Sequence, residues 1–377
     1  MELQGDSRRN SKKKKIVFAP SDNNNWRPWS ELPEALLHQI TNWLGAIDYL
    51  LFARVCRTWR LYALANKQGF MASQSPLVVL FLHLGAKNFC YFYSIVDQRL
   101  FKALLPSLIG KELFGVSFGY LIIVDKRKIS GSEIWLLNPF TGHELSFPSP
   151  PNRFQYVTLA SLPTPSPELI IICFSVECLQ FRRSTDVNWT LYKYDNPQMI
   201  YSLALFNGKI YISNYEGIRV LNLNSLHPHL TLLNVKTNTN VNPGSWQLLG
   251  FDKQLLVICG DSDYEVYELN FLKMELVKIP NLGDQALFQD GIKFSAISNI
   301  TSWEAVGIPP SNNCIYSTIC EYGYDYYDYY SYSVKFFDGR CPQTFRILRG
   351  GRSIRPSCNK FWYFPHQSCR VDSLYED

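Results

Sequence analysis

Long apolar runs are missing from this 377-residue sequence. No stretch approaches the ~20 residues of a membrane-spanning helix. The longest runs, Leu77–Leu84 and Leu169–Phe174, have the length of strands. The basic N-terminal stretch is followed by only a short apolar segment, residues 16–20, which is too short for the core of a signal peptide. We therefore expect a protein of the nucleus and/or cytoplasm with no membrane partner.

Paired cysteine motifs are also missing. The ten cysteines include no C-x-x-C pair, and no close pair is matched by a second Cys or His pair at zinc-site spacing. In a reducing compartment they should be thiols, and their apolar neighbours favour a role as small buried side chains. His227 and His229 form an H-P-H pair without further ligands nearby, which is a weak metal candidate. We predict no metal and no cofactor.

Catalytic signatures do not occur. The sequence has no G-x-S-x-G, no H-E-x-x-H and no Gly-rich phosphate loop. We predict a protein that is not an enzyme, although an active site assembled from distant residues stays open as an alternative.

Positive charge is concentrated at one end. The net charge is +5, and residues 1–15 hold six basic and two acidic side chains, so the other 362 residues carry only +1. A nearly neutral body does not indicate the basic groove of a nucleic-acid-binding protein, and we expect no nucleic-acid partner. Residues 1–28 are predicted to be a disordered basic tail. Its RRNSKKKK run is either a nuclear-import signal or a solvated tail.

Residues 29–70 have a helical pattern. Leu36, Leu37, Ile40 and Leu44 recur at helical spacing, and Asp48 is expected to cap a second helix. Three short helices bury too little surface to be very stable alone. Either a partner covers their remaining apolar side chains, or they pack as a cap on the larger domain.

Residues 76–370 consist of short apolar runs separated by turn residues, and aromatics make up 15% of the sequence, which favours strands. The runs group into units of about 35 to 50 residues, a length typical of propeller blades. We predict a mainly β fold, a β-propeller of six or seven blades preceded by three helices. A pair of β-sandwiches is the competing architecture.

Two stretches resemble known families. Residues 29–63, with Leu32–Pro33 at the start and V-C-x-x-W near the end, resemble an F-box. The rest resembles the kelch-like β-propeller domain of a large group of plant F-box proteins, through FGVSFGYLIIVD (114–125), LLNPFTGHELSFP (136–148), LFNGKIYI (205–212), LLGFDKQLLVICG (248–260), VYELNFLKMELVKIPNLGDQALF (266–288), NNCIY (312–316) and WYFP (362–365).

The resemblance implies the substrate-recognition subunit of a Skp–cullin–F-box (SCF) ubiquitin ligase. The F-box would bind the Skp-type adaptor and, through it, a cullin, while the propeller would bind an unknown protein substrate for ubiquitination and degradation. The residues expected at the adaptor are Leu32, Pro33, Leu36, Leu37, Ile40, Leu44, Leu50, Val55 and Trp59. An interaction scaffold that acts outside ubiquitination is the alternative.

A Tyr-rich stretch, residues 321–333, is the substrate-binding candidate, because tyrosine offers a large rigid surface with a polar tip. Its alternative reading is an extended hairpin with tyrosines along a solvated edge. The predicted substrate-binding residues are Tyr324, Tyr326, Tyr327, Tyr329 and Tyr330.

Overall fold

A computed structural model describes residues 28–84, 87–103, 105, 110–125, 133–140, 142–162, 168–195, 199–222, 229–237, 242–251, 253–260, 264–283, 285–290, 293–298, 314–322, 330–337, 343–350 and 359–365 of the chain. The predicted basic tail lies outside these ranges apart from Pro28. Within the same ranges, no helix has both the length and the apolar character needed to cross a membrane.

Three helices open the described chain. After the short 3-10 helix Trp29–Glu31 come α1 (Glu34–Thr41), α2 (Ala46–Phe52) and α3 (Arg57–Ala72). The expected N-cap at Asp48 is wrong, because the extended backbone of Gly45 (φ −79°, ψ 169°) starts α2 earlier. The second helix ends at Phe52, and the extended backbone of Cys56 (φ −156°, ψ 174°) separates it from α3.

The remainder is β-structure. The strands are β1 (Leu77–Leu84), β2 (Lys87–Ser94), β3 (Arg99–Ala103), β4 (Glu112–Ser117), β5 (Tyr120–Val124), β6 (Ile134–Leu137), β7 (Glu144–Phe147), β8 (Tyr156–Leu162), β9 (Glu168–Phe174), β10 (Cys178–Arg183), β11 (Thr190–Lys193), β12 (Ser202–Phe206), β13 (Lys209–Asn214), β14 (Gly217–Asn222), β15 (Leu230–Leu232), β16 (Gln247–Phe251), β17 (Gln254–Cys259), β18 (Glu265–Asn270), β19 (Glu275–Ile279), β20 (Gln285–Asp290), β21 (Lys293–Ser298), β22 (Cys314–Tyr322), β23 (Tyr330–Phe337), β24 (Gln343–Gly350) and β25 (Asn359–Tyr363).

The described strands form a β-propeller with five regular blades and one irregular sheet. Four blades take their four strands in chain order, β4–β7, β8–β11, β12–β15 and β16–β19, and the fifth has the order β25-β1-β2-β3. The remaining sheet has five strands in the order β21-β20-β22-β23-β24, and its β20 and β22 run parallel. The prediction of six or seven blades was therefore wrong. A parallel pair needs a crossover between distant segments, and a turn pattern does not reveal it.

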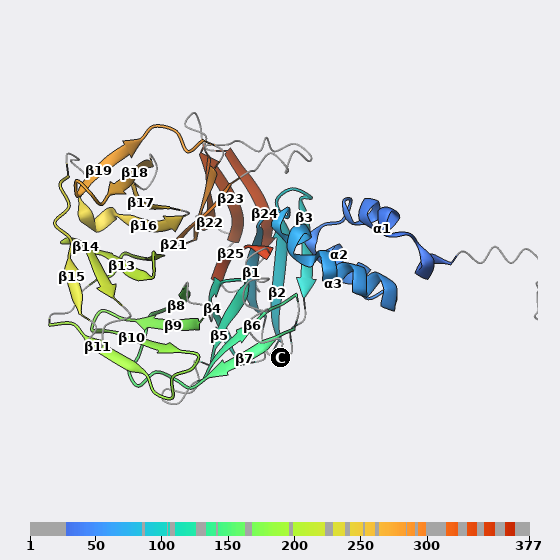
Figure 1. Ribbon diagram of the computed structural model, residues 1–377, viewed down its shortest axis with the longest axis horizontal. Helices are drawn as coiled ribbons and strands as arrows, with labels where there is room; N and C mark the ends of the chain where they lie inside the picture. The colour runs from blue at the N-terminus through green and yellow to red at the C-terminus, as the bar shows by residue number, and fades with distance from the viewer. Residues whose placement is uncertain are drawn as a thin grey trace, which may run out of the picture.

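The sheets succeed one another around a ring, with the helices at one side (Figure 1). Neighbouring sheets meet through their inner strands: β25 contacts β4, β4 contacts β8, β12 contacts β16, and β16 contacts β21. The ring closes within one blade, where Leu77 of β1 pairs with Tyr363 of β25. Segments from the two ends of the domain therefore share one sheet.

The core lies between the sheets. Strand β5 is buried along its whole length, and in β9 the side chains from Leu169 to Phe174 are at most 1% exposed. A strand covered on both faces reads as a continuous apolar run, which is why YLIIV and LIIICF were visible in the sequence. Adjacent blades also approach closely: a Cβ on Gly250 would lie 2.1 Å from the carbonyl oxygen of Leu205. Only glycine fits there without a backbone shift.

Candidate interaction surface on the three helices

The three helices enclose a small core of their own. Seven of its side chains are buried: Leu37, Ala46, Tyr49, Phe52, Tyr62, Ala63 and Met71. Tyr49 stacks on Phe70 with ring centroids 3.8 Å apart, and its hydroxyl donates to the carbonyl oxygen of Ala63 at 2.8 Å. The polar tip of this buried ring is therefore satisfied, and the ring joins α2 to α3.

Many apolar side chains of the helices are left outside this core. Seven large apolar residues between positions 29 and 64 are exposed, with relative exposures that run from 43% for Leu36 to 89% for Trp43. They are Trp29, Leu36, Trp43, Leu51, Val55, Leu61 and Leu64. So many exposed apolar side chains on so few residues mark an interaction surface rather than ordinary surface scatter.

The predicted adaptor-binding residues divide into three groups. Pro33, Leu36 and Val55 are exposed; Leu32, Ile40, Leu44, Leu50 and Trp59 are half-buried and pack against the helical core. Leu37 is 1% exposed, so we remove it from the predicted contact set and assign it to the core. Adjacent residues of a helix lie about 100° apart, so only one of Leu36 and Leu37 faces inward.

Five exposed residues were not in the predicted set: Trp29, Trp43, Leu51, Leu61 and Leu64. For two of them, helical spacing in the sequence could have indicated a shared face. Leu61 and Leu64 are three residues apart on α3 and share one face, while Tyr62 and Ala63 between them are buried.

The segment before α1 is fixed against α3. The indole N–H of Trp59 donates to the backbone oxygen of Trp29 at 2.8 Å, and the Trp59 ring stacks on Phe52 with centroids 4.6 Å apart. The first contact anchors the chain just before Leu32, and Leu32 itself packs against the helical core, so the exposed Pro33 is presented from an anchored segment.

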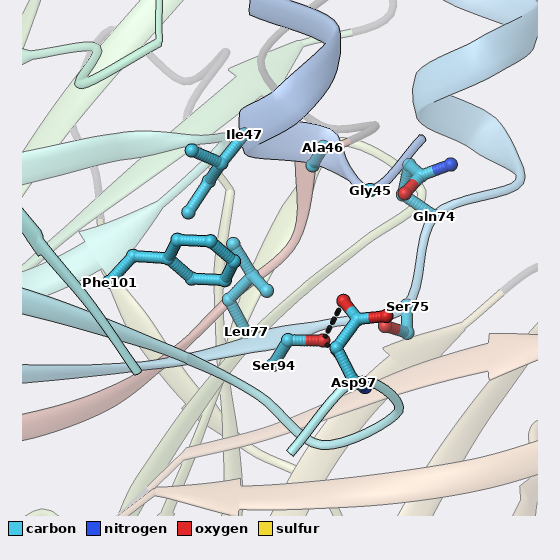
Figure 2. Close-up of a pocket in the computed structure, with 9 residues that line it drawn as sticks. All are labelled: Gly45, Ala46, Ile47, Gln74, Ser75, Leu77, Ser94, Asp97 and Phe101. Carbon is cyan, nitrogen blue, oxygen red and sulfur yellow. Dashed lines mark hydrogen bonds between the residues drawn. The ribbon is translucent and has the colours of Figure 1, made fainter. Parts of the chain in front are cut away.

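The helices join the ring at a close-packed junction, which Figure 2 shows. Ile47 of α2 packs with Phe101 on the core beneath β1 and β2. Beside it, the Ser94 hydroxyl donates to Asp97 Oδ2 at 2.7 Å, and a Cβ on Gly45 would lie 3.3 Å from that carboxylate oxygen. The remaining cavity of about 20 Å³ holds at most a water molecule. The junction is therefore packing surface and not a ligand site.

A second small groove opens on the ring. Tyr156 stacks on Phe174 with centroids 5.2 Å apart, and Met199 is 60% exposed beside them, around a cavity of about 40 Å³. The groove includes Val176, in the turn that joins the second and third strands of its blade. The helices instead contact turns that join third and fourth strands, which hold Asp97 and Phe140. Alternate turns of an antiparallel blade lie at opposite ends of its strands, so the groove opens at the strand ends opposite to the turns that the helices contact.

The Tyr-rich candidate is not tested by the structure. Tyr324, Tyr326, Tyr327 and Tyr329 lie outside the described residues; Tyr330 begins β23, and its side-chain environment lies outside them as well.

The histidines and cysteines with described environments have structural contacts. His38 lies 3.3 Å from the Tyr62 hydroxyl, and His143 lies 2.8 Å from that of Tyr120. Burial raises the pKa of the Cys173 thiol well above its usual value, in accord with the prediction of buried thiols. Within the described ranges, no three His, Cys, Asp or Glu side chains gather as a metal site requires. His227 lies outside them.

The perturbed charged groups belong to surface networks. Lys111 lies over the Trp135 ring, 3.5 Å from its centroid, and burial lowers the pKa of this amine. Glu265 accepts hydrogen bonds from Lys278 and from the Tyr267 hydroxyl, which lower the pKa of the carboxyl. The Glu265 network ties β18 to β19, whereas the Lys111 contact links the segment just before β4 to β6.

Similar solved structures are distant. TolB from Acinetobacter baumannii is 10% identical with a TM-score of 0.42, covering 81% of this chain and 73% of TolB. A quinonprotein alcohol dehydrogenase-like protein from Bacteroides thetaiotaomicron is 11% identical with a TM-score of 0.40, covering 76% of this chain and 78% of that one. Comparison with curated proteins gave no match.

Family models match both parts of the chain. A model of the F-box domain matches residues 29–64, which include all seven exposed apolar side chains of the helices. A model of the KIB1-4 beta-propeller matches residues 92–338, more than half of the 377 residues. The chain therefore belongs to the KIB1-4 beta-propeller family and carries an F-box domain before its propeller.

Proposed function

We propose that this protein is the substrate-recognition subunit of an SCF-type ubiquitin ligase. Its F-box binds a Skp-type adaptor and, through it, a cullin, and its propeller binds the protein to be ubiquitinated. The observation that carries the proposal is the set of seven exposed apolar side chains within the residues matched by the F-box model. The proposed site of action is the nucleus and/or cytoplasm.

The exposed side chains supply a driving force for docking. Burying a large apolar side chain from water contributes roughly 1.5–3 kcal/mol when the burial is complete. Six of the seven side chains are about half exposed, so each of these contributes on the order of 1 kcal/mol when an adaptor covers it. Trp29, Leu36 and Val55 offer the kind of aromatic and aliphatic anchors that dominate interfaces.

The propeller leaves a face free for a target. The groove beside Tyr156 and Met199 opens at the strand ends opposite to the turns that the helices contact, so a target bound there lies away from the adaptor-binding side chains. The Tyr-rich stretch around Tyr324 and Tyr330 remains a second proposed contact with the target, and the kelch-like character of the ring remains a proposal too. The ubiquitin transfer itself belongs to other subunits. This chain contributes proximity, which raises the effective concentration of the target near the conjugating enzyme.

Co-purification with a Skp-type adaptor and a cullin tests the proposal. The intact chain is compared with Leu36→Asp and Val55→Asp, and with Leu272→Asp as the matched control on the propeller, where Leu272 is 97% exposed. A carboxylate placed in an apolar interface should weaken adaptor binding at least about tenfold, while the control stays within about twofold of the intact chain.

All three substitutions are on the surface and should leave the melting temperature nearly unchanged. A folded intact chain that binds neither adaptor nor cullin would contradict the ligase role. It would favour the alternative, a propeller scaffold that acts outside ubiquitination.

A further inference from the structure

Phe140 belongs to two hydrophobic cores at once. It lies on the turn between β6 and β7 and packs against the core of the three F-box helices. The same side chain packs against the propeller core beneath β1 and β2, with its ring centroid 5.8 Å from that of Phe92. A propeller residue therefore helps to complete the core of the F-box.

The turn that holds Phe140 is braced from both ends. The side-chain oxygen of Asn138 accepts a hydrogen bond from the backbone N–H of Phe140 at 3.0 Å. The backbone N–H of Asn138 donates to the backbone oxygen of His143 at 2.9 Å. The His143 ring in turn lies 2.8 Å from the hydroxyl of Tyr120. Asn138 and Tyr120 are fully buried, so the turn presents Phe140 from a fixed base.

The exchange of side chains runs in both directions. Ile47 of α2 packs into the propeller core, as Phe140 packs into the helical core. The Ile47 side chain points from its helix toward Phe101 and Leu77 in Figure 2. An isolated F-box would lose both contacts, and its helices bury too little surface to replace them.

Phe140 also contacts the strand that closes the ring. Its ring centroid lies 5.0 Å from that of Tyr363, which is fully buried in β25 and pairs with Leu77 of β1. Because β25 follows every other described strand in the sequence, Tyr363 reaches this position only when the ring has closed. One contact chain thus runs from the closing strand through Phe140 to the F-box core.

We propose that the closed propeller holds the F-box in its folded form through Phe140, so that only a receptor with a completed ring presents an adaptor-binding surface. This coupling excludes unfolded or incompletely folded receptors from the ligase. The first part of the proposal, that closure of the propeller stabilises the helices, is supported by the contacts alone. The second part, that adaptor binding depends on closure, rests on the proposed function.

Hydrogen exchange of the full chain tests the structural part without any partner. Phe140→Ala is compared with Phe154→Ala, because Phe154 is likewise half-buried and pairs with Phe114 (centroids 5.6 Å apart), but lies in a core that no F-box residue enters. We expect Phe140→Ala to lower the protection of amides in α1–α3 about tenfold or more, and Phe154→Ala to change it less than about twofold.

Unchanged helix protection in Phe140→Ala, beside a weakened β1–β2 sheet, would overturn the inference, since the F-box would then fold by itself. If Phe140→Ala does not fold, Phe140→Leu gives the graded test. Helix and sheet protection should then fall together, and a fall confined to the sheet would contradict the coupling.

Adaptor binding is measured on the same variants. Weaker binding by Phe140→Ala, in proportion to the lost helix protection, is the expected result. Binding unchanged despite lost helix protection would overturn the gating role. A third outcome separates the two proposals. If Phe140→Ala loses helix protection but even the intact chain binds no adaptor, the proposed function is contradicted and the structural coupling still holds.

Discussion

The helices and the propeller use apolar residues in opposite ways. Among the described residues, seventeen large apolar side chains are exposed, and seven of them fall between positions 29 and 64, while the other ten are spread from Leu100 to Val277. Strands such as β5 are buried along their whole length. The propeller buries most of its apolar side chains in its own core, whereas the F-box leaves many of them exposed, where a partner could cover them. The same residue type should therefore have opposite effects in the two regions.

A pair of matched leucines gives the largest expected effect. Leu256 in β17 is 1% exposed, and Leu61 in α3 is 58% exposed. Leu256→Ala leaves a cavity in a packed core and should lower the free energy of unfolding by about 2–5 kcal/mol. Leu61→Ala should change it by no more than about 0.5 kcal/mol.

Urea unfolding measures the two losses of stability. In an adaptor-binding assay on folded protein, Leu61→Ala should weaken binding more than Leu256→Ala does. Similar stability losses in the two variants would show that Leu61 is covered within the chain and would break the comparison.

A pair of glycines should give the next largest effect. A Cβ on Gly250 would overlap the Leu205 carbonyl oxygen at 2.1 Å, whereas a Cβ on Gly69 in α3 would meet nothing within 4 Å. Gly250→Ala must push two blades apart and should cost about 2–3 kcal/mol. Gly69→Ala should stabilise the protein by up to about 1 kcal/mol, because alanine is the better helix former. Thermal unfolding of the two variants is the measurement, and a neutral Gly250→Ala would show that the blades yield more easily than their packing implies.

Much of the propeller could be predicted from the sequence because the strands buried in the middle of its blades are continuous apolar runs. The run Leu77–Leu84 became a strand with the same bounds, and the run Leu169–Phe174 became a strand that starts one residue earlier. Outer strands such as β3 were missed, because Arg99 and Leu100 face solvent and the segment has no apolar run. The irregular sheet was missed because β20 pairs in parallel with β22, which is a non-local contact.

The candidate site was predicted in outline and not in detail. The helical pattern located the F-box, but periodicity alone could not decide that Leu37 faces the core and Leu36 the solvent. The contact of Phe140 with the helices was also beyond the sequence: its N-P-F-T-G motif reads as a turn, and nothing in it indicates a partner far away in the chain. Local patterns predict elements, whereas the junction arises from packing between elements.

The smallest expected effect comes from charge on the propeller surface. Lys278 and the Tyr267 hydroxyl both donate to Glu265, and these bonds lower the pKa of the carboxyl from its ordinary value of 4.5. A lowered pKa in the folded state stabilises the protein above the ordinary pKa, and the contribution disappears as the pH falls through the lowered value. The Glu265 side chain is 39% exposed, so solvent screening limits the contribution to about 0.5 kcal/mol. Glu265→Gln should therefore be slightly less stable than the natural chain in urea at pH 7, and the difference should shrink as the pH falls through the lowered pKa. Lys278→Met should lose the same increment at pH 7, and a difference that does not shrink with falling pH in either variant would assign the effect to packing and not to charge.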